Sequence, residues 1–214
     1  MNSKHIPALR YNFLTRWYDA VVGSTMPEQK FKQALIEQAN VLSNMNVLDF
    51  GCGTLTLSLL LRAQNSNVGI FAIDVDDKVL EIAKQKNESA NAGIALVKYD
   101  GAKLPFADNT FERVMSSLVF HHLTGEQKLN VLQEIHRVLK PEGELHIADW
   151  GKAQNILMRT LFYPVQLLDG FKTTQENVEG KLPAFIQQAG FSLVEIKKSF
   201  STVYGTLQLF KAKK

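Results

Sequence analysis

The hydrophobic pattern begins with a helical stretch and continues as an alternation of strands and helices. The segment 6–43 is predicted to be helical, with Pro27 as a break or a first-turn residue. In its second part, apolar residues recur at helical spacing: Phe31, Leu35, Ala39 and Leu42. Short apolar runs then predict five strands, at 46–50, 68–73, 94–99, 111–119 and 144–149. Helical patterns at 55–63, 78–90 and 125–139 lie between them, and the sequence Lys140–Gly143 ends the last of these helices.

The C-terminal part of the chain follows a different pattern. A helix is predicted over 177–189, and two strands are predicted over 191–198 and 203–210. The link 199–202 is too short for a parallel crossover, so these two strands should form an antiparallel hairpin. Alternating strands and helices form parallel sheets that are covered on both faces. We therefore expect an α/β fold: a Rossmann-like, doubly wound sheet of seven strands, mostly parallel, with an antiparallel C-terminal hairpin.

Length and composition fit one domain with a sizeable core. The chain has 214 residues, 45% of them hydrophobic. Its 24 Lys and Arg residues exceed its 21 Asp and Glu residues by three, and Lys211, Lys213 and Lys214 account for that excess. Such a tail is not the clustered basic face that nucleic-acid binding usually needs. We therefore expect no nucleic-acid partner.

Cysteine content and hydropathy bear on the compartment. Cys52 is the only cysteine, so an internal disulfide is impossible and a reducing compartment fits best. The sequence shows neither the apolar run of a signal peptide nor a stretch near the ~20 residues that span a bilayer. These features predict a cytoplasmic protein without a transmembrane segment, either a monomer or a homodimer.

The strongest chemical signal is a glycine turn between the strand 46–50 and the following helix. Gly51 and Gly53 allow the backbone to bend sharply and let a ligand approach without a Cβ in the way. A purely structural turn is the alternative. The dinucleotide fingerprint requires a third glycine at position 56, where this chain has Thr56. Asp74, about 20 residues on, suits either kind of nucleotide cofactor.

Four motifs in order resemble those of the class I methyltransferases that use S-adenosylmethionine, closest to the branch related to ubiquinone and menaquinone biosynthesis. An acid, Asp49, stands two residues before the first glycine, and Asp74 ends the second strand. The third motif, 99–106, contains Asp100 and Gly101, and the fourth, 111–123, contains Ser117. The resemblance is dense over 47–149 and looser toward the terminal hairpin.

The resemblance implies S-adenosyl-L-methionine as the cofactor and a role for each motif. Asp74 would accept hydrogen bonds from the ribose hydroxyls, Asp100 and Gly101 would recognise adenine, and Asp49 would anchor the glycine turn and the methionine ammonium group. Ser117 would face the cofactor. The full set of expected cofactor-binding residues is Asp49, Gly51, Cys52, Gly53, Thr54, Asp74, Val75, Asp100, Gly101, Ala102 and Ser117.

Methyl transfer depends mainly on alignment, and a base is needed only for an acceptor that must lose a proton. His121 and His122, just past the fourth strand, are the candidate bases, with loop packing as their alternative role. Tyr18 resembles a tyrosine that lies over the cofactor in related enzymes. The five histidines and one cysteine show no metal-ligand spacing, so no metal is expected.

One position departs from the family pattern. The family usually has a third glycine where this chain has Leu55, beside the methionine part of the cofactor. We expect the Leu55 side chain to point into the helix packing, so that the cofactor still binds.

We expect a single domain over 1–214. Within it, 1–43 forms a helical lid, 44–150 the cofactor-binding core, 151–176 a segment that covers the substrate, and 177–214 a C-terminal helix and hairpin. The apolar residues of 151–176 favour a small, apolar or aromatic acceptor, quinone-like or lipid. Core packing and a dimer face are the alternative explanations, and together they outweigh any specific substrate. The rival functions are a protein that binds S-adenosylmethionine without transferring its methyl group, an NAD-linked oxidoreductase and a nucleic-acid methyltransferase.

Overall fold

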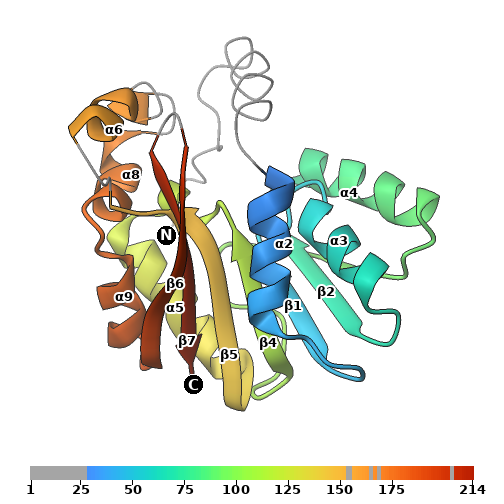
Figure 1. Cartoon of the computed structure of the whole chain (residues 1–214). Helices are drawn as coiled ribbons and strands as arrows, with labels where there is room; N and C mark the ends of the chain where they lie inside the picture. The colour runs from blue at the N-terminus through green and yellow to red at the C-terminus, as the bar shows by residue number, and fades with distance from the viewer. Residues whose placement is uncertain (1–27, 153–155, 164–165, 168–169, 203–204) are drawn as a thin grey trace.

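A seven-stranded sheet organises the molecule (Figure 1). The computed structural model describes residues 28–152, 156–163, 166–167, 170–202 and 205–214. The strand order is β3-β2-β1-β4-β5-β7-β6. The strands are β1 Asn46–Phe50, β2 Gly69–Asp74, β3 Ala95–Lys98, β4 Phe111–Ser117, β5 Leu139–Trp150, β6 Ser192–Ser201 and β7 Thr206–Lys213. The first five pair in parallel, and β7 is antiparallel to both β5 and β6. The predicted fold class and terminal hairpin are therefore confirmed.

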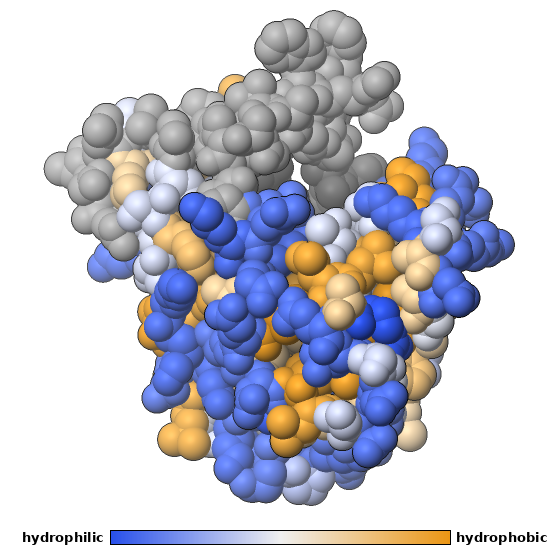
Figure 2. Space-filling view, turned by 45° about the vertical axis from the view of Figure 1, so that its right-hand side comes forward, coloured by the Kyte–Doolittle hydropathy of each residue, from blue (hydrophilic) through white to orange (hydrophobic). Residues whose placement is uncertain are grey.

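Helices cover both faces of the sheet, and each face has its own hydrophobic core. The helices are α2 Glu28–Ala39, α3 Thr56–Gln64, α4 Asp77–Ser89, α5 Gly125–Val138, α6 Ile156–Leu161, α8 Phe171–Val178 and α9 Leu182–Gln188, with the short 3-10 helix η1 at Phe120–His122. Residues of α2, α3 and α4 share one core, and residues of α5 and α9 share the other. On the face shown in Figure 2, hydrophilic residues dominate and apolar residues form small groups between them. No helix in the described ranges is long and apolar enough to cross a membrane.

Strand order reverses between β1 and β4. From β1 the chain moves outward to β2 and β3, and then returns to the other side of β1 to form β4 and β5. Their carboxyl ends meet at one edge, where Phe50 of β1 pairs with Ile73 of β2 and with Ser116 of β4. Open α/β sheets bind ligands at the carboxyl edge where strand order reverses.

Local signals fix where the helices around this edge begin. The Asp76 carboxylate caps α4 by accepting hydrogen bonds from the amides of Lys78 at 2.8 Å and Val79 at 3.4 Å. Thr124 and Gln127 form a reciprocal capping box at the start of α5. Both helices therefore start at defined residues just beyond the strand tips.

Two predicted helices differ from the structure. The helix predicted over 177–189 is divided, because α8 ends at Val178, Gly180 takes a left-handed φ of 76° and α9 begins at Leu182. Pro183 in the first turn of α9 has no amide hydrogen to continue an earlier helix. In the N-terminal stretch, α2 ends at Ala39 rather than Ser43, since Asn40 has a φ of 43°. Residues 6–27 of that prediction lie outside the described residues.

The sequence 140–143 also behaves differently from the predicted turn. It lies within β5, which starts directly after α5. Phe111 pairs with Leu139, and the next pair is Arg113 with Glu144, so a bulge accommodates the extra residues. The positive φ of Glu142, 65°, lies within this bulge.

Leu55 combines an unfavourable backbone with a buried side chain. It precedes α3 with φ 72° and ψ 14°, the left-handed conformation that favours glycine. Its side chain is 0% exposed and belongs to the core shared with α2 and α3. As expected, the leucine points into the helix packing. Packing energy therefore offsets the backbone cost at this position.

This arrangement predicts that glycine at position 55 is more stable than alanine, which is the reverse of their usual order within a helix. Leu55→Ala keeps the strained φ and loses the packing, which should lower the unfolding free energy by about 2–5 kcal/mol. Leu55→Gly loses the same packing but removes a backbone cost of about 1 kcal/mol, so it should be the more stable variant of the two. Urea unfolding measures both.

Leu61 supplies the matched control, because it is 2% exposed and lies inside α3 at a helical backbone position. There, Gly should be less stable than Ala by about 1 kcal/mol. If Leu55→Gly also proved less stable than Leu55→Ala, the left-handed assignment at position 55 would be wrong.

Candidate functional site

The glycine turn is fastened to the neighbouring strand tip by backbone hydrogen bonds. The amides of Gly51 and Cys52 both donate to the carbonyl of Ile73, each at 2.9 Å. Gly51 has a φ of 69°, and a Cβ on it would collide with the side chain of Val119, which follows β4. Glycine is therefore required twice here, by the bend and by the packing of the loop after β4 against it.

Asp74 closes the turn from the tip of β2. Its Oδ2 accepts a hydrogen bond from the amide of Gly53 at 2.9 Å. Its Oδ1 accepts from its own neighbours, the amides of Val75 at 2.8 Å and Asp76 at 3.1 Å. A carboxylate offers about four acceptor positions, so roughly one remains, on Oδ2. The sequence predicted a carboxylate that grips two ribose hydroxyls, whereas this arrangement leaves room for one without rearrangement.

Asp49 is buried beneath the turn at 3% exposure. The hydroxyl of Ser58, in α3, donates to its Oδ2 at 2.6 Å. Burial raises the pKa of Asp49 to about 6, although the Ser58 hydrogen bond opposes that rise. The carboxylate therefore carries its charge at neutral pH at a cost to folding.

The loop after β3 forms another side of the site. Asp100 accepts a hydrogen bond from the amide of Ala102 at 2.9 Å, and Gly101 has a φ of 85°. Underneath, the ring of Phe50 contacts Tyr99 and Phe120, with centroid distances of 5.9 and 6.0 Å. This aromatic row joins the tips of β1 and β3 to η1 and gives the site a rigid apolar floor.

Three features show that the residues present fit a polar ligand such as the expected cofactor. A Cβ on Gly53 or on Gly101 would meet no atom of the described residues within 4 Å, so both glycines border space that these residues leave open. At the tip of β4, the hydroxyl of Ser117 is buried and has no hydrogen-bond partner among the described residues. A buried hydroxyl is normally paired, so this one indicates a ligand or water as its partner.

A histidine and an aspartate form a buried pair beside the turn. Nδ1 of His121, in η1, lies 2.8 Å from Oδ1 of Asp149, near the end of β5. The Asp149 side chain is 0% exposed and that of His121 5%. An ionised carboxylate only accepts hydrogen bonds, so we assign the ring proton to Nδ1. This is the arrangement in which a carboxylate orients an imidazole as a base.

The Asp149 carboxylate also organises the loop that carries this histidine. Oδ2 accepts from the amides of Val119 at 3.1 Å and Phe120 at 2.7 Å, and Oδ1 accepts from the amide of Trp150 at 2.7 Å. Burial pushes the pKa of Asp149 upward, but the neighbouring His121 and these N–H donors outweigh it and hold the pKa below its ordinary value. The side chain is thus an ionised anchor for the loop.

The second histidine has a different environment. The ring of His122 lies against that of His121, with centroids 3.9 Å apart. Burial, together with the neighbouring His121, lowers the pKa of His122 to about 3. A histidine with so low a pKa is a weak proton acceptor at neutral pH.

Two further predicted residues have other contacts. The hydroxyl of Thr54 accepts a hydrogen bond from Lys86 at 2.9 Å. Cys52 is buried within the turn, and burial raises the pKa of its thiol well above its ordinary value. Tyr18 lies outside the described residues.

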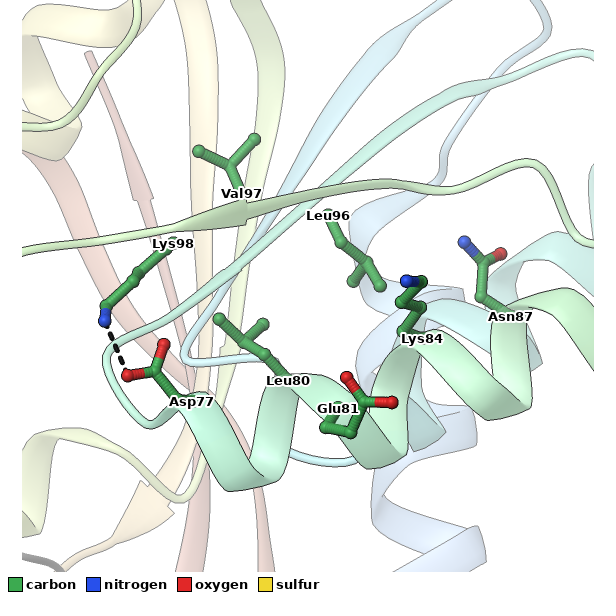
Figure 3. Close-up of a pocket in the computed structure, with 8 residues that line it drawn as sticks. All are labelled: Asp77, Leu80, Glu81, Lys84, Asn87, Leu96, Val97 and Lys98. Atoms are coloured by element: carbon green, nitrogen blue, oxygen red, sulfur yellow. Dashed lines mark hydrogen bonds and ion pairs between the residues drawn. The ribbon is translucent and has the colours of Figure 1, made fainter.

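A surface groove between α4 and β3 is separate from this site (Figure 3). Its apolar lining comes from Leu80, Leu96 and Val97, and the Asp77–Lys98 ion pair, at 2.6 Å, lies at one end. None of the residues predicted from the sequence to bind the cofactor lines this groove.

The sequence interpretation missed Asp149 and Val119 as site residues. The available signal for Asp149 was an acid at the end of a strand, next to the strand that precedes the two histidines. Ser117 pairs with Ala148 across β4 and β5, which brings those two strand ends together. The contact of Val119 with Gly51 had no sequence signal, because it depends on how the loop folds back.

Comparison with known proteins agrees with this geometry. The family model described as "Methyltransferase domain" matches residues 47–143, a range that contains the glycine turn, all of β1 but its first residue, and β2 to β4. An uncharacterised methyltransferase from Synechocystis is 26% identical over 189 residues, covering 87% of this chain and 84% of that protein. A demethylmenaquinone methyltransferase from Staphylococcus epidermidis is 37% identical over 120 residues, covering 53% of this chain and 48% of that protein. The match thus spans about half the length of that enzyme.

A solved structure gives the same fold. The S-adenosylmethionine-dependent methyltransferase from Aquifex aeolicus superposes with a TM-score of 0.65 at 20% identity, covering 91% of this chain and 96% of that one. Family model, relatives and fold agree with the ordered motifs at the carboxyl edge of the sheet. Residues 47–143 thus match the methyltransferase domain family, and the chain has the fold of S-adenosylmethionine-dependent methyltransferases.

Proposed function

We propose that this methyltransferase acts on a small, apolar or aromatic acceptor that loses a proton when it is methylated, such as a quinol-like ring carbon or a phenolic hydroxyl. The observation that carries the proposal is the buried His121–Asp149 pair beside the glycine turn. Demethylmenaquinone methyltransferases among the relatives support a ring acceptor.

The cofactor-binding roles are assigned to the residues around the turn. S-adenosylmethionine supplies a methyl group that its sulfonium already activates for displacement. Asp74 accepts a hydrogen bond from a ribose hydroxyl at the remaining position on Oδ2, and the hydroxyl of Ser117 faces the bound nucleoside. The loop with Asp100 and Gly101 borders the adenine. The charge of Asp49 attracts the cationic methionine end.

His121 takes the acceptor's proton through the ring nitrogen that faces away from Asp149. The carboxylate holds the imidazole in one tautomer and stabilises the imidazolium that forms. His122, with its low pKa, packs against this ring and keeps it in place. An amine with a free lone pair needs no such base for the methyl transfer itself, so the pair favours carbon or hydroxyl acceptors.

We assign 1–214 to one domain in which 44–150 binds the cofactor and the described part of 151–176 covers the acceptor. Of the segment 1–43 that the sequence predicted to be a lid, residues 1–27 lie outside the described residues, and α2 packs in the core shared with α3 instead. Within the cover, the ring of Phe162 packs edge-on against Trp150 at the end of β5, with centroids 5.1 Å apart. Apolar packing of this kind excludes water from the displacement.

The acceptor class is tested by turnover with quinols, phenols and amines in the wild type and in two histidine variants. His121→Asn should lower kcat for a hydroxyl or carbon acceptor by about 100-fold or more, the usual contribution of a general base. The affinity for S-adenosylmethionine, measured by calorimetry, should stay unchanged.

His122→Asn is the matched control, and its kcat should fall less than that of His121→Asn. Equal losses in the two variants would remove the proton-acceptor role from His121. Cofactor binding without turnover of any acceptor would identify a protein that binds S-adenosylmethionine but does not transfer its methyl group.

Asp74→Ala should weaken the binding of S-adenosylmethionine and of its demethylated product by about 1–3 kcal/mol, because a half-buried hydrogen-bond acceptor is lost. Titration calorimetry measures both affinities. Asp77→Ala is the control, since Asp77 is exposed, pairs with Lys98 and lies outside the proposed site. An unchanged affinity in Asp74→Ala would contradict the ribose role.

Asp49→Asn should make the protein more stable and should weaken its binding of the cofactor. The pKa of Asp49 is raised in the folded state, so its ionisation destabilises the fold above about pH 6 and this cost disappears as pH falls below the unfolded value near 3.8. At pH 7 the variant should therefore be more stable than the wild type by up to about 3 kcal/mol. It should also bind S-adenosylmethionine more weakly.

Urea titrations of both proteins from pH 4 to pH 8 measure this difference. It should grow with rising pH and level off above about pH 6. A difference that does not depend on pH would show that Asp49 is not destabilised by burial.

A further inference from the structure

Among the described donors to Asp149, Asn177 is the one that does not lie at the ends of β4 and β5. The other described donors belong to residues 119–121 and 150, all at the tips of β4 and β5. Asn177 lies in α8, and its Nδ2 donates to Asp149 Oδ1 at 3.2 Å and to the carbonyl of Trp150 at 3.4 Å. Both partners only accept hydrogen bonds, so the orientation of the amide is determined.

The rest of the Asn177 side chain is poorly explained by packing alone. The residue is 1% exposed, and its Oδ1 is buried without a hydrogen-bond partner among the described residues. An unpaired buried acceptor destabilises a fold, and an apolar side chain of similar volume would avoid that cost. The amide is therefore better explained by its effect on Asp149 than by a role in packing.

A buried lysine fixes the helix that carries this amide. The Lys128 side chain in α5 is 0% exposed, and its Nζ donates to the carbonyl of Thr173 and to Oε2 of Glu176, each at 2.9 Å. Thr173 and Glu176 belong to α8 and flank the turn that leads to Asn177. The position of the amide is thus set by the docking of α8 against α5.

We propose that Asn177 is a positioning residue for the His121–Asp149 pair, and that it makes the geometry of this pair depend on the docking of α8. It donates to the same carboxylate oxygen, Oδ1, that accepts from His121. It therefore restricts rotation of the carboxylate and shares the negative charge that faces the imidazole. The inference rests on the proposed function only for its effect on turnover.

The charged surroundings of the pair determine the direction of the effect. Among the described residues, the other titratable groups that act on Asp149 are His122, against the ring of His121, and Lys128, with Glu176 as its partner. None of them is altered by removing the amide. Without the Asn177 hydrogen bond, more negative charge remains on Oδ1, and the His121 imidazolium should become more stable.

The test uses Asn177→Leu, which removes the donor and keeps a similar volume. With the best acceptor, kcat at neutral pH should fall about tenfold while KM for both substrates changes little, since the change affects the base and not the binding contacts. The acid limb of the kcat profile should move upward by about half a pH unit, as expected when His121 holds its proton more tightly.

A spectroscopic readout keeps the test independent of turnover. In protein with ¹⁵N-labelled histidine, the Nδ1 signal of His121, assigned with His121→Asn, should shift in Asn177→Leu. The pKa obtained by titrating that signal should rise. Asn87→Leu is the control. Asn87 lies in α4, away from the site, and among the described residues its side chain bonds to the backbone of Ile94. It should lower stability without moving the His121 signal.

The outcomes separate the two proposals. If His121 shows the same signal and the same titration in Asn177→Leu as in the wild type, the positioning role is overturned, whatever happens to kcat. If that signal shifts but the wild type turns over no acceptor, Asn177 positions the pair and the proposed function fails. Restoration of the signal by Asn177→Gln, which retains the amide, would further support the role.

Discussion

A buried negative charge on Asp149 organises the catalytic edge of this protein. Water does not reach this carboxylate, and its ionisation is stable only because N–H groups surround it. Two backbone amides that bond to it belong to the loop after β4, so the charge fixes the course of that loop as well as the ring of His121. An anion in this place determines the path of the chain and the orientation of the imidazole by the same hydrogen bonds.

The acids of the site therefore have different physical roles, although each stands near the end of a strand. Asp149 is ionised and well paired, whereas Asp49 carries its charge against the effect of burial. Asp74 is used mainly by backbone amides, that of Gly53 in the glycine turn and those of its own neighbours Val75 and Asp76. A binding edge built this way is preorganised, because the turn holds its shape through its own hydrogen bonds before a ligand arrives.

Much of this could be predicted from the sequence. The strand–helix alternation specified the sheet and the hairpin, because hydrophobic period and loop length leave few alternatives. The sequence did not show that the helix expected over 177–189 is in fact two helices, because Gly180 and Pro183 are each tolerated near helix ends. The motifs indicated the glycine turn and its acids. Asp149 and Asn177 were missed, because their roles arise from contacts across 27 to 30 residues of sequence.

The close packing of Val119 against Gly51 has a thermodynamic consequence. The cofactor turn and the loop that carries His121 share this contact, so neither can move without changing the surroundings of the other. In the proposed arrangement, with the methyl donor at the turn and the acceptor beside His121, a shift in one segment on binding alters the free energy of binding at the other. By linkage that effect is reciprocal: the factor by which the methyl donor changes the acceptor's affinity equals the factor by which the acceptor changes the donor's.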